Sequence, residues 1–339
     1  MQFALLVKSH ANVRYAQSMQ LLALRECECM LEALGHTAKL YWDTLAGNSF
    51  LIMETEVMDD QAWSYLSRHS AISFAGLRDG DWLKPLPLMQ TPYLEADLAQ
   101  VLKYKGKTNA DFTTMMLHCA KAASAFALVQ HPLTVFDPLC GRGTTLFCAL
   151  SEGDNGIGMD TDAKALHEAD VYFERYLQYH RLKHRRQEKS ITLRQGRALV
   201  ERCFEVANTS EAYKQKDTRT LRLIHGDTIY AEEAIGKERC HLIVGDLPYG
   251  VQHAPKAGGM SGSLETLLTK ALPAYKRVLK PGGAIALAFN TYTLSKPWLV
   301  DALKNNGFTV LESAPFHDFA HWVEQAVNRD MVIARNDEK

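Results

Sequence analysis

One segment of the chain, residues 133–160, constrains the fold more than any other. It runs from a short apolar strand (133–136) through a glycine-containing turn (137–144, sequence DPLCGRGT) into a helix, and then into a second strand that ends at Asp160. This order of strand, turn, helix, strand and acid is the first half of a doubly wound nucleotide-binding fold. The glycines let the backbone approach a ligand, and the acid can accept both ribose hydroxyls. We therefore predict an α/β fold with a Rossmann-like sheet.

The same turn narrows the choice of ligand. A phosphate-binding Walker loop ends in Gly-Lys-Ser/Thr, but Gly143 is followed by two threonines. A dinucleotide site needs a third glycine where this chain has Leu146. A ligand with an amino acid tail and a nucleoside but no pyrophosphate fits the turn better. S-adenosylmethionine (SAM) matches that description.

A second stretch of the sequence suits the handling of a planar ring that bears an amino group. The apolar run 241–244 predicts a buried strand that stops near Asp246. Pro248 prevents further strand pairing, Tyr249 places a flat ring at the strand end, and Gly250 permits close approach. Taken alone, the stretch is equally typical of a strand end with a tight turn.

The remaining pattern predicts two parts of unequal size. Residues 1–85 indicate a small α+β domain in β-α-β-β-α order, with a hairpin turning at 46–48, no catalytic constellation and a possible role in positioning RNA. Residues 86–130 are predicted to be a linker followed by a helix that leads into the next domain. The chain is expected to be extended at 84–87, and the helix to span 111–129 with Asn109 as its N-cap. Residues 131–339 are predicted to hold the catalytic domain, interrupted by a long, mostly helical and basic insert at about 164–222.

Basic residues are concentrated at 103–107 and within 181–222, although the whole chain has a net charge of only −1. Within 181–222, twelve Lys and Arg face five Asp and Glu, a local excess of seven positive charges. A solvated loop or helix face accounts for such residues as well as phosphate contact does. The candidate nucleic-acid contacts are Lys103, Lys105, Lys107, Arg181, Arg185 and Arg186.

Composition excludes several other classes of protein. No run of about 18 apolar residues predicts a membrane span, and the start lacks the features of a signal peptide. The seven cysteines are scattered without metal-type spacing, so we expect a cytoplasmic protein with reduced thiols and no metal. His317, Asp318 and His321 follow a predicted strand and fit a capping or surface role better than a metal site.

The two motifs, taken in order along the chain, resemble those of SAM-dependent methyltransferases that modify exocyclic amines of nucleobases. Within that family the sequence is most similar to the tRNA and rRNA guanine-N2 methyltransferases, over roughly residues 105–335. Leu247 stands where the amino-methyltransferase tetrapeptide usually has proline, a departure that favours RNA guanine-N2 over DNA adenine-N6. Those RNA enzymes usually carry a THUMP module, which residues 1–85 do not resemble.

The resemblance implies a class I methyltransferase sheet, mostly parallel with an antiparallel last strand, and assigns the site. Asp246, the Pro248 carbonyl and Tyr249 would act on the target base. Asp137 would steer the ammonium of SAM, Asp160 would bind its ribose, and Asp227 with Thr228 would contact its adenine. The cofactor-binding residues implied are Asp137, Leu139, Cys140, Gly141, Gly143, Thr144, Asp160, Asp227, Thr228 and Asp246.

Two other functions are compatible with these motifs. The acid, turn and aromatic ring would serve any planar amine, so the substrate can also be adenine-N6 in DNA or RNA, or glutamine in a protein. A SAM-binding RNA module without catalysis is the third reading, and the presence of both Asp246 and Tyr249 argues against it.

Overall fold

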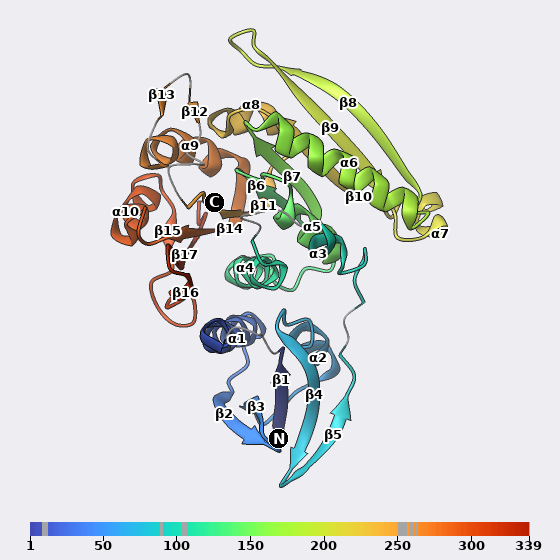
Figure 1. Ribbon diagram of the computed structural model, residues 1–339, viewed down its shortest axis with the longest axis vertical. Helices are drawn as coiled ribbons and strands as arrows, with labels where there is room; N and C mark the ends of the chain where they lie inside the picture. Colours follow the sequence, from blue (N-terminus) through green and yellow to red (C-terminus); the bar gives the residue numbers. More distant parts are fainter. Residues whose placement is uncertain are drawn as a thin grey trace.

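The described residues form two large β-sheets with separate sets of helices, and a small two-stranded ladder (Figure 1). The structure is a computed structural model and describes residues 1–8, 13–88, 91–102, 108–249, 256–257, 260–261 and 264–338. Lys103, Lys105 and Lys107 lie outside the described residues. No helix in the described ranges is both long and apolar enough to cross a membrane.

The amino-terminal part is an antiparallel sheet covered by two helices. The strand order is β2-β3-β1-β4-β5. Ala46 and Gly47 have φ values of 49° and 80°, as the two-residue turn of the predicted hairpin requires. The elements are β1 (Gln2–Val7), α1 (Val13–Leu34), β2 (Lys39–Leu45), β3 (Asn48–Glu54), α2 (Asp60–Leu66), β4 (Ile72–Asp79) and β5 (Trp82–Leu86).

The prediction of a linker at residues 84–87 is wrong for residues 84–86, which are part of a strand. Residues 84–86 belong to β5, where Pro85 pairs with Gly76 of β4. Strand β5 forms the edge of its sheet, and an edge strand tolerates proline because one side of its ladder is unused. Two prolines in four residues therefore obscured a strand in the sequence pattern.

The second sheet is the Rossmann-like sheet predicted from the sequence. Its strand order is β15-β17-β14-β11-β6-β7-β10-β9-β8, and β16 pairs with β17. Strands β10, β7, β6, β11 and β14 run parallel, whereas β17 is antiparallel to β14. The mostly parallel sheet with an antiparallel last strand is confirmed. Its strands are β6 (Thr134–Asp137), β7 (Asn155–Asp160), β8 (His184–Thr192), β9 (Ala198–Val206), β10 (Arg219–His225), β11 (Cys240–Asp246), β14 (Leu279–Asn290), β15 (Thr309–Val310), β16 (His321–Glu324) and β17 (Val327–Arg335).

Helices cover both faces of this sheet. One apolar core includes residues of α4, α5 and α6, and the other includes residues of α8, α9 and α10. Strands β12 (Lys256–Ala257) and β13 (Met260–Ser261) form a separate two-stranded ladder. The remaining helices are α3 (Leu98–Val101), α4 (Ala110–Ala123), α5 (Thr144–Ser151), α6 (Ala163–Tyr179), α7 (Ser210–Lys214), η1 (Thr228–Tyr230), α8 (Ala231–Ile235), α9 (Leu264–Val278) and α10 (Lys296–Asn305).

The insert at about 164–222 is only partly helical, which corrects the prediction. After α6 the chain forms the long β8–β9 hairpin, which extends the sheet beyond β10 (Figure 1). Leu199 is buried on one face of the sheet, whereas Phe204 and Val206 are buried on the other. The next position on the face of Leu199 holds the buried Glu201, which pairs with Arg222 of β10. Because a charged residue stands at a buried position, the alternation of apolar and polar residues that predicts a strand is not recognisable in the sequence.

Helix α4 is shorter than the predicted 111–129. Its predicted cap is confirmed, because the Asn109 side chain accepts hydrogen bonds from the amides of Asp111 (2.7 Å) and Phe112 (3.3 Å). The helix ends where Ser124 becomes extended and its hydroxyl accepts a bond from the Phe126 amide at 3.1 Å. The Ala125 amide then bonds to the Gly282 carbonyl at 2.8 Å, which ties this segment to β14.

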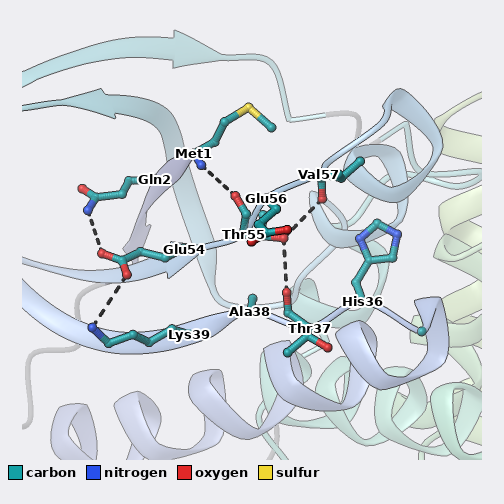
Figure 2. A pocket seen from close by; sticks show the side chains of 11 residues that line it. Met1, Gln2, His36, Thr37, Ala38, Lys39, Glu54, Thr55, Glu56 and Val57 are labelled. Carbon is teal, nitrogen blue, oxygen red and sulfur yellow. Dashed lines mark hydrogen bonds and ion pairs between the residues drawn. The ribbon is translucent and has the colours of Figure 1, made fainter.

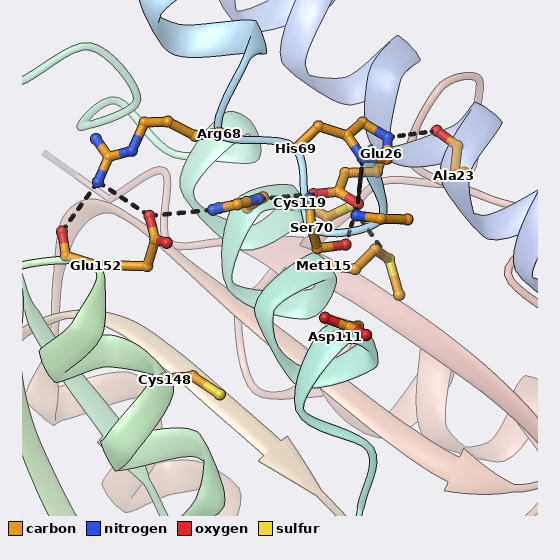
Figure 3. A network of polar contacts seen from close by, with 12 residues as sticks. Ala23, Glu26, Arg68, His69, Ser70, Asp111, Met115, Cys119, Cys148 and Glu152 are labelled. Atoms are coloured by element: carbon orange, nitrogen blue, oxygen red, sulfur yellow. Dashed lines mark hydrogen bonds and ion pairs between the residues drawn. The ribbon is translucent and has the colours of Figure 1, made fainter. Parts of the chain in front are cut away.

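A buried polar network joins the amino-terminal part to the second sheet's helices (Figure 3). Glu26 of α1 is fully buried and contacts His118 Nδ1 of α4 at 2.6 Å. It also accepts bonds from the amide and hydroxyl of Ser70, at 2.8 and 2.5 Å. On the other side of the His118 ring, Glu152 lies 3.2 Å from Nε2 and 3.0 Å from Arg68. Helix α1 is therefore fixed to α4 by charged groups as well as by apolar packing.

A pocket of about 890 Å³ lies at one end of the amino-terminal sheet (Figure 2). The Met1 ammonium donates to the Thr55 carbonyl at 2.7 Å. Glu54 accepts a bond from Gln2 at 2.7 Å and lies 3.7 Å from Lys39. These polar groups satisfy one another, and none of the residues assigned to the site by sequence lines the pocket.

Candidate active site

The glycine turn after β6 lies against the neighbouring strand β7. The Cys140 amide bonds to the Met159 carbonyl at 3.0 Å, and a β-carbon on Gly158 would lie 2.7 Å from the Cys140 sulfur. Cys140 is therefore a packing residue whose side chain faces β7. Gly141 and Gly143 have φ values of 50° and 84°, in the left-handed region that favours glycine.

The turn leaves open space where a ligand is expected. Apart from Gly141 itself and its two chain neighbours, no atom of the described residues lies within 4 Å of the position that a β-carbon on Gly141 would take. At Gly143 the atoms nearest to the same position belong to the Phe147 ring, at 3.4 Å and beyond. Leu139 is partly exposed, whereas Thr144 is buried at the start of α5. The backbone of residues 141–143 is thus the part of the turn that a ligand can approach.

Three aspartates gather at the carboxyl ends of β6, β7 and β11. Asp137 is 3% exposed, and burial, with smaller contributions from Asp160 and Asp246, raises its pKa to about 7. The Thr145 hydroxyl and the Leu139 amide, which is 3.1 Å from the carboxylate, act in the opposite direction. A cationic ligand would relieve this mutual repulsion.

Asp160 connects β7 to the glycine turn. One carboxylate oxygen accepts a bond from the Gly141 amide at 2.8 Å, and the other accepts one from the Asp162 amide at 2.8 Å. Burial is the main cause that raises the pKa of Asp160. The carboxylate is held at the edge of the sheet, where the sequence predicted a ribose contact.

Asp246 is surrounded by hydrogen-bond donors from distant parts of the chain. The Tyr249 hydroxyl donates to one carboxylate oxygen and the Thr108 hydroxyl to the other. Arg329 of β17 lies 3.8 Å from the second oxygen. Burial raises the pKa of Tyr249 well above its usual value, and Asp246 raises it further.

Two residues that the sequence reasoning missed support the Tyr249 side of the site. Arg329 is 4% exposed, and its guanidinium lies 4.2 Å from the centre of the Phe112 ring and 5.1 Å from that of Tyr249. Asn290 of β14 donates to the Tyr249 carbonyl at 3.3 Å and to the Ala326 carbonyl at 3.0 Å. Only Asn290, a polar residue ending an apolar strand, leaves a trace in the sequence pattern.

Leu247 points away from the site. It is 1% exposed, packs in the core with residues such as Leu287, and its amide bonds to the Ala288 carbonyl at 2.8 Å. Its side chain cannot contact a base directly. Pro248 is partly exposed and follows it into the turn that carries Tyr249.

The third ligand-side strand ends in a short 3₁₀ turn. Asp227 caps this turn by accepting a bond from the Ile229 amide at 3.1 Å. The Thr228 hydroxyl is buried and lies 2.9 Å from the Tyr275 hydroxyl. The Thr228 hydroxyl is therefore bonded within the domain, just beyond the carboxyl end of β10.

The arginines proposed to contact nucleic acid lie away from this edge. Arg185 and Arg186 are near the start of β8, opposite the last residues of β9, and Arg181 precedes them. Arg186 makes two bonds to Asp170, at 2.8 and 3.0 Å, so its charge is already neutralised. No group of His, Cys, Asp and Glu in the described part of the chain could hold a metal ion.

No family model and no curated protein matches the sequence. Solved structures resemble the fold over most of the chain. TrmN from Thermus thermophilus is 16% identical with a TM-score of 0.40, over 88% of this chain and 60% of its own. A putative rRNA-methylase from Clostridium thermocellum is 17% identical with a TM-score of 0.37, over 69% and 98%. Magnesium protoporphyrin IX methyltransferase from Synechocystis PCC 6803, solved with bound SAM, is 11% identical with a TM-score of 0.41, over 71% and 90%.

Proposed function

We propose that this protein is a SAM-dependent methyltransferase that modifies the exocyclic N2 amine of a guanosine in tRNA or rRNA. The observation that carries the proposal is the position of Asp246. It ends β11, directly beside β6 and its glycine turn, so an acceptor for an amine and a space for a cofactor share one edge of the sheet. Ligands of open α/β sheets bind at this edge.

The residues present fit SAM. The open space above Gly141 admits an extended group against the backbone, and Asp137 and Asp160 supply negative charge for an ammonium and acceptors for ribose hydroxyls. When bound, SAM would supply an electrophilic methyl group on a positively charged sulfur. The mutual repulsion of the aspartates favours a cationic ligand over a phosphate.

Asp246 and the Pro248 carbonyl would each accept a hydrogen bond from one N–H group of the target amine. An exocyclic amine is a weak nucleophile because its lone pair is delocalised into the ring. Two acceptors polarise the nitrogen, and the carboxylate stabilises the positive charge that develops on it. The Tyr249 ring would stack on the base, which must be unpaired or flipped out to reach this edge.

The hydrogen bonds around Asp246 describe the site before the base enters. Both carboxylate oxygens accept hydroxyl hydrogens, from Tyr249 and Thr108. The target amine would replace the Tyr249 hydroxyl on Asp246, which frees the ring to stack. Arg329, 3.8 Å away, pairs with the carboxylate and fixes its orientation.

The proposal is tested by identifying the methylated nucleoside. Purified protein is incubated with SAM labelled on its methyl group and, separately, with unmodified tRNA, rRNA and DNA, and the digests are analysed by mass spectrometry. We expect N2-methylguanosine in an RNA digest. N6-methyladenine, or label in protein alone, would replace the proposal by one of the two other planar-amine substrates. The choice of guanine in RNA rests on the sequence resemblance, including Leu247, whose side chain is buried in the core.

Asp160→Ala is predicted to weaken SAM binding by roughly 10–100-fold, the range expected for hydrogen bonds to a charged group. The variant also removes the acceptor of the Gly141 amide. Isothermal titration calorimetry measures the change. Asp217→Ala is the control, since this aspartate is exposed and pairs with Arg219 at the opposite end of β10. Equal affinity in the Asp160 variant and wild type would place the ribose elsewhere.

A further inference from the structure

The β8–β9 hairpin spans the full height of the sheet, so its two ends face opposite edges. His225, at the carboxyl end of β10, pairs with Val200 of β9 and with Asp160 of β7. Val200 is therefore level with the cofactor side of the sheet. The hairpin continues two residues further before it turns at 193–197, so its tip projects beyond the carboxyl edge.

The other end of the hairpin is remote from the site. Arg185 pairs with Glu205, which pairs with Thr220 near the start of β10. At about 3.3 Å per residue, Arg185 lies roughly 16 Å toward the amino edge from the level of Val200. The arginines singled out from the sequence thus sit at the wrong end of the hairpin for contact with a substrate at the carboxyl edge.

The tip carries three basic side chains that form no ion pair within the described residues. Glu233 of α8 lies beside the tip but contacts the Arg194 backbone amide, not a basic side chain. Residues 189–197 contain Lys189, Arg194 and Arg197 and no acid. All three are exposed. The nearest acids on β8 and β9 are already paired, Glu188 with Arg202 at 3.1 Å and Glu201 with Arg222.

The tip is held in place by the body of the domain. Leu193 is 2% exposed and belongs to the same core as Leu199, and a β-carbon on Gly226 would lie 2.9 Å from Leu199. The Arg194 amide bonds to the Glu233 carboxylate of α8 at 2.6 Å. The turn is closed by a bond from the Leu193 amide to the Arg197 carbonyl at 2.8 Å. The backbone that carries Arg194 and Arg197 is therefore held against the domain.

We propose that the tip of the β8–β9 hairpin, residues 189–197, binds the sugar-phosphate backbone of the RNA whose base is methylated beside Asp246. This inference rests on the proposed function and adds the surface that positions the substrate. Five strand spacings of about 4.8 Å separate β11 from β8, a span of roughly 24 Å along the edge. An RNA strand a few nucleotides long bridges that span, with one base at Asp246 and phosphates at the tip.

The double variant Arg194→Ala/Arg197→Ala tests the proposal. Binding is measured by fluorescence anisotropy with a labelled 12-nucleotide single-stranded RNA of mixed sequence, over a range of KCl concentrations. Loss of two phosphate contacts is expected to reduce the slope of log affinity against log salt by about 1.4 and to weaken binding roughly 10–30-fold at 0.1 M salt. The KM for unmodified tRNA should rise while kcat and the affinity for SAM stay within about twofold.

The matched control is Lys183→Ala/Arg185→Ala, which removes two exposed charges from the remote end of the same hairpin. This variant should keep the wild-type salt slope. An unchanged slope in the tip variant, or an equal loss in the control, overturns the assignment. Wild-type protein that binds the RNA through the tip but methylates no nucleic acid would instead overturn the proposed function and leave the surface as an RNA contact.

Discussion

Replacing Asp246 by Asn is expected to lower the rate of methyl transfer by about 10²–10³-fold, the usual cost of removing one preorganised group that stabilises transition-state charge. The substitution keeps the shape of the side chain but removes its negative charge. It also places an amide NH₂ where an oxygen now accepts a hydrogen from Tyr249 or Thr108. Asp246→Ala should be at least as severe. Single-turnover kinetics with saturating SAM measure the chemical step directly.

The affinity for SAM provides the control for that prediction. Because the turn at 141–143 and Asp160 are untouched, the dissociation constant from calorimetry should stay within a few-fold of wild type. A rate of methyl transfer within tenfold of wild type would falsify the role given to Asp246.

A pair of Tyr249 variants separates the ring from its hydroxyl. Tyr249→Phe removes the hydroxyl that bonds to Asp246 and keeps the surface on which a base can stack, so most of the activity should remain. Tyr249→Ala removes the platform, and base stacking on an aromatic ring contributes about 1–3 kcal/mol. Equal activity in the Phe and Ala variants would mean that Tyr249 holds the site together and does not stack on the base.

The sequence predicted the parts of the site that follow from local pattern. Asp137, Asp160 and Asp246 each end an apolar strand, and parallel strands bring their carboxyl ends to one edge of the sheet. The glycines of the turn were expected to permit close approach of a ligand, and the structure adds that Gly141 and Gly143 have left-handed backbone. These features require only a strand order and a short motif.

The parts that the sequence did not predict depend on contacts between distant segments. Thr108 and Asp246 are 138 residues apart in the chain, and Arg329 reaches the same carboxylate from the last strand. No local periodicity marks either residue. Thr108 is positioned when the neighbouring helix α4 packs on the sheet, and Arg329 when β17 pairs with β14. Only the tertiary structure therefore brings the two residues to Asp246.

The basic insert shows how charge can mislead a reading of secondary structure. Its net positive charge was evident, but its strands were not, because Glu201 and Arg202 interrupt the apolar positions of β9. The inward charge is compensated by Arg222 on the neighbouring strand. The hairpin register, which cannot be obtained from composition, then decides which of the basic residues lie near the site.

Replacing Glu26 by Gln is expected to destabilise the protein by about 1.5–3 kcal/mol, the range for losing a hydrogen bond to a charged group. Glu26 is fully buried, and His118 loses its closest carboxylate, 2.6 Å away. Glu152 still contacts the other side of the ring at 3.2 Å, so part of the network survives. Urea unfolding at pH 7 measures the difference. Glu211→Gln, which changes an exposed pair 3.6 Å apart with Lys214, is the control and should shift stability by less than about 0.5 kcal/mol.

The same network predicts how wild-type stability depends on pH. Glu152 and Glu26 together raise the pKa of His118 from 6.5 to about 9, despite burial, which acts in the opposite direction. A raised folded-state pKa means that the stabilisation is complete below about pH 6.5 and is lost as the pH rises through 9. The loss amounts to about 3 kcal/mol at 1.36 kcal/mol per pKa unit. The pKa of Glu152 is lowered to about 2 by His118, so its contribution is present above about pH 4.5 and disappears toward pH 2.

The alkaline loss in the wild type should therefore be reduced in Glu26→Gln, because His118 has one carboxylate fewer to raise its pKa. Unfolding free energies at pH 6.5, 7.5, 8.5 and 9.5 compare the two proteins. The loss of stability in Glu26→Gln should also affect the surroundings of Asp246, because α4 carries both His118 and Phe112, and the Phe112 ring packs against Arg329. Parallel pH profiles for the two proteins would show that Glu26 does not raise the pKa of His118.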